Sequence, residues 1–237
     1  MIPTDHACNA RNVFPGTLYG QRDHDLNWMC DDVEIDYKST DMPSEAIMNM
    51  LRGRYSPDFP LAKKLPTNEN SRIFLYWNGH GGENFFKIAD TELVHSQDLA
   101  KVFDEMYLKG RYKEIMFLLD TCEALSMFDQ IESPNIYMIA TSDHEESAVA
   151  QDIDHEIANY LSDNFSRDFF DFLYSPAGYV HKPDFSVADF PAQFPFTMIK
   201  STVKLKNTSE TRKLKDVLLR EFVPVNEDPL EEGIDGK

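Results

Sequence analysis

The sequence predicts an α/β domain with a mostly parallel sheet, and three apolar runs carry this prediction. The runs 72–77, 114–119 and 135–140 have the length and composition of buried strands. A segment with clear helical periodicity separates the first two, and another helical pattern follows the third. This order of elements is typical of a parallel sheet with helices packed on its faces.

The amino-terminal part is expected to hold a long polar excursion and one short helix. Residues 1–42 are rich in turn-forming side chains. A helix over 43–52 follows, because its apolar residues share one face and Gly53 suits its end. Three prolines in 54–72 indicate a loop that leads into the first strand.

The clearest helix spans 97–109. Its apolar residues recur at the spacing of one helical face, at Leu99, Val102, Phe103, Met106 and Tyr107. Ser96 is the expected N-cap, and Gly110 the expected end. The strand 114–119 is apolar throughout, as a strand covered on both faces should be. A last helix is expected over 155–174, whose apolar side chains form a broad face.

Composition narrows the classes of function. The chain has 237 residues and a net charge of −18, with 42% hydrophobic and 27% charged residues. This charge excludes a nucleic-acid partner, because phosphate neutralisation needs a basic face. Three cysteines, Cys8, Cys30 and Cys122, do not make a disulfide framework. No apolar stretch approaches the ~20 residues that span a membrane, and no signal segment follows Met1. Taken alone, these features predict a soluble intracellular protein.

Two of the predicted strands end in side chains suited to catalysis. One leads into Asn-Gly-His-Gly-Gly at 78–82, and the other into Asp-Thr-Cys at 120–122. The carboxyl ends of parallel strands form one edge of the sheet, where such folds carry their sites. A thiol and an imidazole meeting there suffice for nucleophilic acyl transfer. We therefore expect Cys122 to be a nucleophile and His80 its base.

Both residues also have a simpler interpretation. A free cysteine is most often a small buried apolar residue, and a histidine in a glycine-rich turn can simply bond the backbone. The polar neighbours of Cys122 favour an accessible thiolate instead. The glycines beside His80 leave space for a substrate, and the backbone N–H groups of Gly81 and Cys122 are candidates for binding an oxyanion.

Two acidic segments, 31–36 and 152–156, have oxygen ligands suited to a hard cation. Neither has the spacing of a known calcium loop, so a solvated acidic face is the better explanation for both segments. The histidines other than His80 show no zinc-ligand spacing with the cysteines.

Six stretches resemble one known family. They are ACNARNVFPGT at 7–17, DDVEIDYK at 31–38, SRIFLYWNGHGG at 71–82, DLA at 98–100, RYKEIMFLLDTC at 111–122 and SPNI at 133–136. On these residues the chain resembles the catalytic subunits of GPI-anchor transamidases, which are caspase-like cysteine peptidases related to legumain. The Gly-His-Gly-Gly turn alone fits legumains and caspases as well, whereas the first two stretches point to the transamidase branch.

The resemblance implies a caspase-like three-layer sandwich and a cysteine-dependent transamidase. Cys122 and His80 fall on the family's catalytic dyad. The thiolate would cleave the carboxyl-terminal GPI-attachment signal of a proprotein and keep its carbonyl as a thioester. The ethanolamine phosphate amine of a GPI anchor would then accept that carbonyl. This catalysis requires no cofactor.

The resemblance also implies partners and a structural ion. Cys8 falls on a position that forms a disulfide with a partner subunit. Glu34, the carbonyl of Ile35, and Asp36 fall on a segment that holds calcium. The implied partners are the other subunits of the membrane complex, the proprotein signal peptide and the GPI glycolipid. The implied location is the lumenal side of the endoplasmic reticulum membrane.

The chain also departs from the family. It starts at Met1, so the amino-terminal strand and helix of the fold are expected to be missing. Glu123 stands where the family usually has glutamine, and Thr141 and Ser142 begin a segment that differs from the family pattern. These three residues are predicted to line the substrate pocket, which leaves the substrate preference open.

We expect residues 1–180 to form the peptidase or transamidase domain, 181–225 a carboxyl-terminal extension of it, and 226–237 an acidic disordered tail. Two other functions stay open from the sequence. One is a legumain-like soluble cysteine endopeptidase, in which water resolves the thioester. The other is an inactive truncated paralogue that only binds the partners of the complex.

Overall fold

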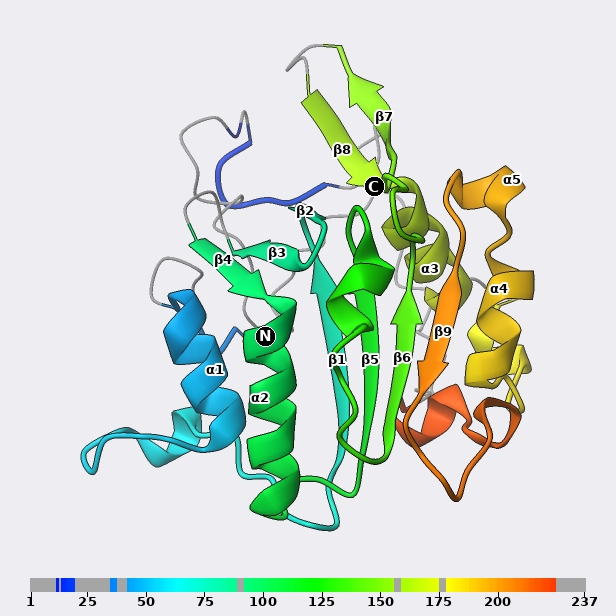
Figure 1. The fold of residues 1–237 in the computed structure, drawn as a ribbon. Coiled ribbons are helices and arrows are strands. Elements are labelled where there is room, and N and C mark those ends of the chain that lie inside the picture. The colour runs from blue at the N-terminus through cyan, green and yellow to red at the C-terminus, as the bar shows by residue number, and fades with distance from the viewer. Residues whose placement is uncertain are drawn as a thin grey trace, which may run out of the picture.

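The three apolar runs of the sequence form neighbouring strands of a four-stranded sheet in a computed structural model of the chain (Figure 1). The structure describes residues 12, 14–19, 35–37, 42–88, 92–155, 159–174 and 178–224. Cys8, Glu34 and the tail 226–237 lie outside these residues, as does most of the expected excursion over 1–42.

The helices and strands follow one another in α/β order. They are α1 (Ser44–Arg52), β1 (Arg72–Asn78), β2 (Gly81–Gly82), β3 (Phe85–Ile88), β4 (Glu92–His95), α2 (Ser96–Leu108), β5 (Glu114–Asp120), β6 (Ile136–Ala140), β7 (Ala150–Asp154), β8 (Asn159–Asp163), α3 (Asn164–Tyr174), α4 (Phe190–Gln193), α5 (Phe196–Ile199) and β9 (Lys204–Asn207). Short 3-10 helices lie at Leu61–Lys63, Ala124–Phe128, Tyr179–His181, Val187–Asp189, Leu214–Asp216 and Leu219–Glu221.

The main sheet has the strand order β1-β5-β6-β9. The pairs β1–β5 and β5–β6 are parallel, and β9 joins β6 antiparallel. Every residue of β5 is buried, because neighbouring strands flank it and helical layers cover both faces. In the part of the chain that is described, β1 forms one edge of this sheet. The mostly parallel sheet expected from the sequence is confirmed.

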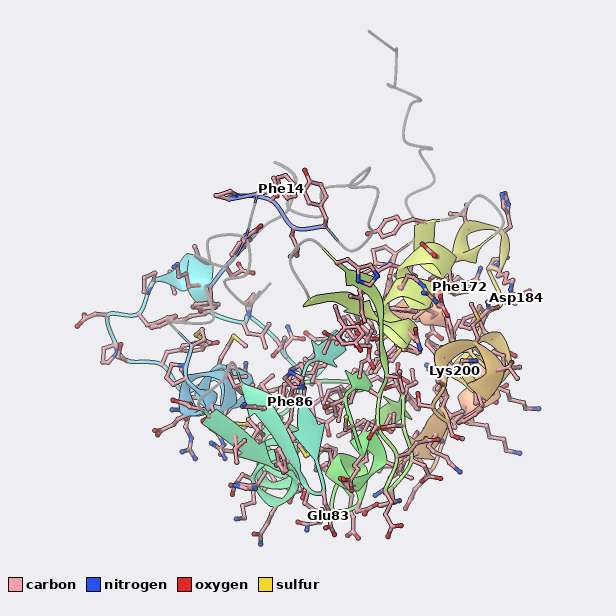
Figure 2. All side chains as sticks on the ribbon, turned by 90° about the horizontal axis from the view of Figure 1, so that it is seen from above. Phe14, Glu83, Phe86, Phe172, Asp184 and Lys200 are labelled. Carbon is pink, nitrogen blue, oxygen red and sulfur yellow. The ribbon has the colours of Figure 1, made fainter. Side chains whose placement is uncertain are left out.

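The core divides into two apolar clusters, one on each face of the sheet. Ile115, Phe117 and Leu119 of β5 point to the face covered by α1, α2 and the small sheet β2-β3-β4, whereas Met116 and Leu118 point to the face covered by α3, α4 and α5. The alternation follows from the two-residue period of a strand. Phe86 and Phe172 lie on opposite sides of the sheet in Figure 2.

Both early helices form where the sequence predicts them. Helix α1 ends at Gly53, whose φ of 68° lies in the left-handed region that favours glycine. Helix α2 begins one residue earlier than expected, because Ser96 is its first residue and not its N-cap. The Ser96 hydroxyl donates to the side-chain oxygen of Asn84, at 3.2 Å, and so ties α2 to the β2–β3 turn.

The prediction of one helix over 155–174 is wrong in its first half. Residues 159–163 form β8, which pairs with β7 as an antiparallel hairpin, and α3 begins only at Asn164. The helical spacing of Tyr160 with later aromatic residues suggested one long helix, but the Tyr160 side chain is 53% exposed and takes no part in the core. Strand pairing with β7, which local periodicity does not report, decides the structure here.

A charged cluster joins the carboxyl-terminal segment to the amino ends of the strands. Glu114 is buried at the start of β5 and accepts hydrogen bonds from Arg72 at 2.8 Å, Tyr137 at 2.7 Å and Arg212 at 2.8 Å. Glu221 pairs with the same two arginines. Burial favours a raised pKa for Glu114, but these hydrogen bonds outweigh it and lower the pKa to about 2.

We expect Glu114 to make the fold sensitive to acid. Its pKa is depressed in the folded state, so its stabilising effect is complete above the ordinary value of 4.5 and is lost as the pH falls towards 2. The loss amounts to about 3 kcal/mol at most. Urea unfolding of the wild type and of Glu114→Gln between these pH values measures it. Parallel pH profiles would contradict the assignment, and Glu132→Gln, an exposed control, should follow the wild type.

Candidate active site

The register of β1 and β5 brings the two candidate catalytic residues to one edge of the sheet. Asn78 and Asp120 are the last paired residues of the two parallel strands. The Gly79 N–H donates to the carbonyl of Asp120 at 3.1 Å and extends the pairing by one step. His80 and Cys122 each follow two residues beyond the Asn78–Asp120 pair, so the chains carrying them leave the sheet side by side (Figure 1).

The turns that carry these residues are in direct contact. A Cβ atom on Gly81 would lie 2.4 Å from Oγ1 of Thr121 and 2.9 Å from the carbonyl oxygen of Phe85. No side chain fits at position 81 while Thr121 stays in place. The residue after His80 therefore packs against the residue before Cys122, which the sequence analysis did not foresee for Thr121.

We expect Gly81→Ala to disturb this contact and to lower the reactivity of Cys122. The added methyl overpacks the turn, a change that costs about 1–3 kcal/mol. Mass-spectrometric measurement of iodoacetamide labelling at Cys122 reports the effect, and a tenfold slower reaction is expected. Thr121→Ala in the same chain removes the closest clash and should restore part of the rate.

The matched control for this change is Gly79→Ala in the same turn. A Cβ atom at Gly79 first meets the ring of Phe86 at 3.2 Å, a side chain that can shift slightly. Gly79→Ala should therefore label close to the wild-type rate. Equal labelling of Gly81→Ala and the wild type would show that the close packing of the two turns has no influence on the thiol.

Cys122 is a free, half-buried thiol at the start of a sharp turn. Its Sγ donates to the carbonyl of Ala148 at 3.8 Å, so the segment after β6 lies beside it. Glu123 adopts a left-handed conformation with φ 51°, and its N–H donates to the carbonyl of Glu146 at 2.8 Å. This turn directs the chain into the 3-10 helix Ala124–Phe128 and leaves Cys122 at the tip.

His80 is exposed, and its imidazole has no hydrogen-bond partner among the described residues. Its carbonyl accepts from the N–H of Lys87 at 2.8 Å, which anchors the turn to β3. No hydrogen bond joins its ring to Cys122 within the described part of the chain, since the thiol bonds Ala148 instead. Catalytic hydrogen bonds are often long in unliganded enzymes and tighten when substrate binds.

Two backbone N–H groups at this edge lack a backbone acceptor among the residues described. Hydrogen-bonded and non-hydrogen-bonded pairs alternate in an antiparallel ladder. Lys87 bonds His80, so the next pair, Gly81 with Phe86, is a non-hydrogen-bonded one, and the Gly81 N–H points away from β3. The Cys122 N–H likewise donates to no described residue. These are the two groups that the sequence analysis singled out for an oxyanion.

Two of the residues expected in a substrate pocket have a supporting position in the structure. Thr141 and Ser142 are fully buried. The Thr141 hydroxyl donates to Asp120 at 2.7 Å, and the Ser142 hydroxyl donates to the carbonyl of Thr121 at 2.6 Å. They hold the β5 end and the Cys122 turn in place, while Glu123 is half-buried beside them. A direct contact of these residues with substrate stays a prediction.

The remaining predicted site residues, which concern the disulfide and the calcium ion, are only partly among the described residues. Cys8 and Glu34 lie outside the described residues. Ile35 is 37% exposed and Asp36 is half-buried. In the described ranges, no group of three or more histidine, cysteine or acidic side chains is placed to hold a metal ion. The calcium prediction is therefore untested.

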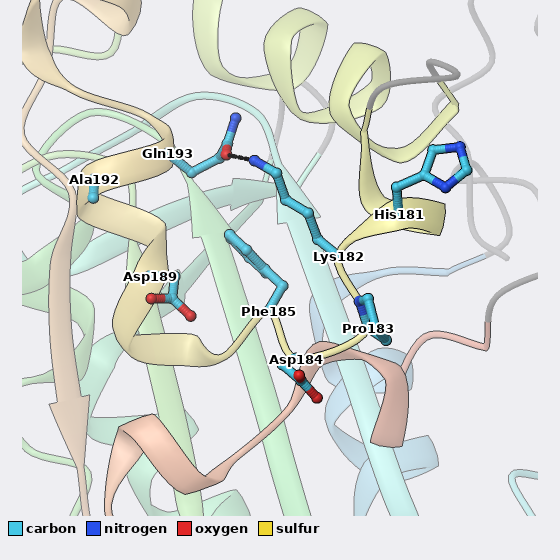
Figure 3. Close-up of a pocket in the computed structure, with 8 residues that line it drawn as sticks. All are labelled: His181, Lys182, Pro183, Asp184, Phe185, Asp189, Ala192 and Gln193. Carbon is cyan, nitrogen blue, oxygen red and sulfur yellow. Dashed lines mark hydrogen bonds between the residues drawn. The ribbon is translucent and has the colours of Figure 1, made fainter.

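A surface hollow of about 480 Å³ lies elsewhere on the molecule. It is lined by His181, Lys182, Pro183, Asp184, Phe185, Asp189, Ala192 and Gln193 (Figure 3). Lys182 spans it and donates to the side-chain oxygen of Gln193 at 2.6 Å. None of the predicted site residues lines this hollow, so we place the candidate active site at the strand ends.

Fold and strand ends together are typical of a caspase-like cysteine peptidase, with a three-layer sandwich and a thiol beyond a central parallel strand. Residues 1–211 match the peptidase C13 family. This match covers most of the chain, and the chain belongs to that family.

Several curated proteins that are similar to this chain are GPI-anchor transamidases. The GPI-anchor transamidase of Saccharomyces cerevisiae is 37% identical over 223 residues, which cover 94% of this chain and 53% of the relative. Those of Schizosaccharomyces pombe and Homo sapiens are each 34% identical, over 94% of this chain and 58% and 55% of their own lengths. The chain thus spans about half the length of the curated relatives it matches.

Proposed function

We propose that this chain is the catalytic part of a GPI-anchor transamidase, with Cys122 as nucleophile and His80 as its proton carrier. The observation that carries the proposal is the parallel register of β1 and β5, which places both residues two positions beyond the Asn78–Asp120 pair. The names of the curated relatives support the same reaction.

The proposed reaction is an acyl transfer in two steps. The Cys122 thiolate adds to the carbonyl at the attachment site of a proprotein, and the N–H groups of Gly81 and Cys122 stabilise the oxyanion. His80 protonates the departing amine of the signal peptide, which leaves a thioester on Cys122. The amine of a GPI ethanolamine phosphate then attacks the thioester, gives its proton to His80 and releases the Cys122 thiolate.

The partners follow from the proposed reaction. They are the other subunits of the transamidase complex, the signal peptides of proproteins and the GPI glycolipid. The proposed place of action is the lumenal side of the endoplasmic reticulum membrane, and Cys8 would link the chain to a partner subunit. Within the ranges that the structure describes, no helix has the length and apolarity needed to cross a bilayer.

A calcium ion at Glu34, the Ile35 carbonyl and Asp36 is part of the proposal. The donors are all oxygens, which is the chemistry that calcium prefers. Such an ion would stabilise the segment without touching the thiol, since the transfer needs no metal. A rise of the melting midpoint with added calcium, absent in Asp36→Ala, is the measurement that bears on it.

A chimera tests the proposed function. This chain replaces its aligned region in the yeast relative, and the chimera is expressed in cells that lack that relative. We expect GPI-anchored proteins to reach the cell surface with the chimera and not with its Cys122→Ala form. A well-expressed chimera that fails to restore anchoring would overturn the proposal. Release of free, unanchored protein by the chimera would favour a peptidase that uses water.

A further inference from the structure

A polar cluster lies beneath the strand ends and takes no part in the proposed chemistry. We call it the Asp120 cluster. Its members come from β1, β5, β8, the start of α3 and the residue after β6, namely Tyr76, Asn78, Asp120, Asp163, Ser166 and Thr141. Asp120 is 1% exposed.

The hydrogen bonds converge on the carboxyl group of Asp120. Its Oδ1 accepts from the hydroxyl of Thr141 at 2.7 Å. Its Oδ2 accepts from the hydroxyl of Ser166 at 2.9 Å and from Nδ2 of Asn78 at 3.0 Å. The Ser166 oxygen in turn lies 2.7 Å from the hydroxyl of Tyr76. These contacts join four of the five elements, namely β1, β5, the start of α3 and the residue after β6.

A second carboxylate reaches the same donor. Asp163 Oδ2 accepts from Nδ2 of Asn78 at 2.8 Å, the same nitrogen that bonds Asp120. Asp163 also accepts from the N–H of Ser166 at 2.7 Å with its other oxygen, and so caps α3. Within the described residues, no lysine, arginine or histidine pairs with either carboxyl group.

Two neighbouring carboxyl groups without a cation cannot both ionise cheaply when one of them, here Asp120, is fully buried and the other, Asp163, is half-buried. Burial raises the pKa of Asp120 well above its ordinary value, and the charge of Asp163 and a hydrogen bond between the two groups raise it further. The titratable group facing them from β1 is Tyr76, whose pKa is also raised, by burial and by the two carboxyl groups. Ser166 and Thr141, the neighbours from the other elements, are uncharged.

We propose that Asp120 and Asp163 share one proton, and that this pair, together with Asn78, positions the β1 and β5 ends that carry His80 and Cys122. The proton resides on Asp120, the more buried of the two, and Asp120 donates it to the Asp163 carboxylate. Asn78 bridges both groups at the position where β1 and β5 are last in register. The inference rests on the proposed function in that Cys122 is the reacting group.

Asparagine at position 120 is neutral, as the protonated acid is, but it does not titrate. Comparison with Asp120→Asn therefore isolates the pH dependence that Asp120 contributes to stability. A carboxyl group whose pKa is raised by folding stabilises the fold at low pH, and the effect is lost as the pH rises. The unfolding equilibrium constant of the wild type should therefore rise relative to that of Asp120→Asn by up to about tenfold per pH unit above pH 4. Urea unfolding of both proteins from pH 4 to 9 measures this ratio.

Labelling of Cys122 with iodoacetamide tests the positioning role. Asp120→Asn should label within about threefold of the wild type, because its amide is neutral and keeps a donor towards the Asp163 carboxylate. Asp120→Leu removes the carboxyl oxygens that accept from Thr141, Ser166 and Asn78, and it should label at least tenfold more slowly, or fail to fold. Asp98→Asn, an exposed change on α2, is the control and should match the wild type in both assays.

Two results would overturn the inference. One is a ratio of the unfolding equilibrium constant of the wild type to that of Asp120→Asn that does not change with pH. The other is labelling of Asp120→Asn that is as slow as that of Asp120→Leu. Both readouts need only the folded chain, so they are independent of GPI transfer. Failure of the chimera with an intact pH dependence would reject the proposed function alone.

Discussion

Alanine in place of Cys122 is expected to reduce transamidation to background while leaving the fold almost unchanged. Removal of a catalytic nucleophile costs on the order of 10⁶-fold in rate in an enzyme of this kind of chemistry. The side chain is half-buried, and its thiol makes one weak contact, with the carbonyl of Ala148 at 3.8 Å. Its loss should therefore lower the free energy of unfolding by less than about 1 kcal/mol.

The measurement is thioester formation on a peptide that carries an attachment site, followed by mass spectrometry of the intact protein. His80→Ala should show a similar loss, since the thiol then lacks a base and the leaving amine lacks an acid. Cys30→Ala is the matched control, because the proposed reaction does not use that cysteine. Thioester formation by Cys122→Ala at the wild-type rate would show that another residue is the nucleophile.

Alanine in place of Phe117 is expected to have the largest effect on stability. Phe117 is fully buried at the middle of β5. The centroid of its ring lies 5.3 Å from the ring centroid of Trp77, 5.9 Å from that of Phe103 and 5.2 Å from that of Phe128. The four rings join β1, α2, β5 and the 3-10 helix after Cys122. Truncation of a buried phenylalanine costs about 3–5 kcal/mol.

Urea unfolding at neutral pH measures this loss. Leu108→Ala is the control, because this leucine is 83% exposed at the end of α2 and should change stability by less than about 0.5 kcal/mol. A loss below about 1.5 kcal/mol for Phe117→Ala would mean that the neighbouring rings close the cavity. The contact between Phe117 and Trp77 also fixes β5 to β1. In this variant the iodoacetamide labelling of Cys122 should therefore change at a lower temperature than in the wild type.

The elements that the sequence predicted well are those whose signal is local. Helix α2 and strand β5 have strong periodic or continuous apolar patterns, and both lie within one residue of the expected positions. The β7–β8 hairpin was missed because pairing with β7 stabilises β8, and the aromatic residues there have helical spacing. Strand β9 was also missed, because its apolar and polar residues alternate only weakly and pairing with β6 stabilises it.

The candidate site divides in the same way. The rule that parallel strands end at one edge predicted that His80 and Cys122 would be neighbours, and the register of β1 and β5 supports it. The Asp120 cluster could not be predicted, because Asp163 and Ser166 reach it from a hairpin and a helix far along the chain. A charged residue at the end of an otherwise apolar strand was the one available signal.

The cluster around Glu114 has a practical consequence for anyone who trims this protein. The match to the family ends at residue 211, one position before Arg212. A fragment cut at that boundary loses Arg212 and Glu221 and leaves the buried Glu114 with Arg72 and Tyr137. Such a fragment should express poorly and precipitate, although every residue that the family comparison recognises is present. Fragments that continue to residue 224 retain the counter-charges and are the better starting point for biochemistry.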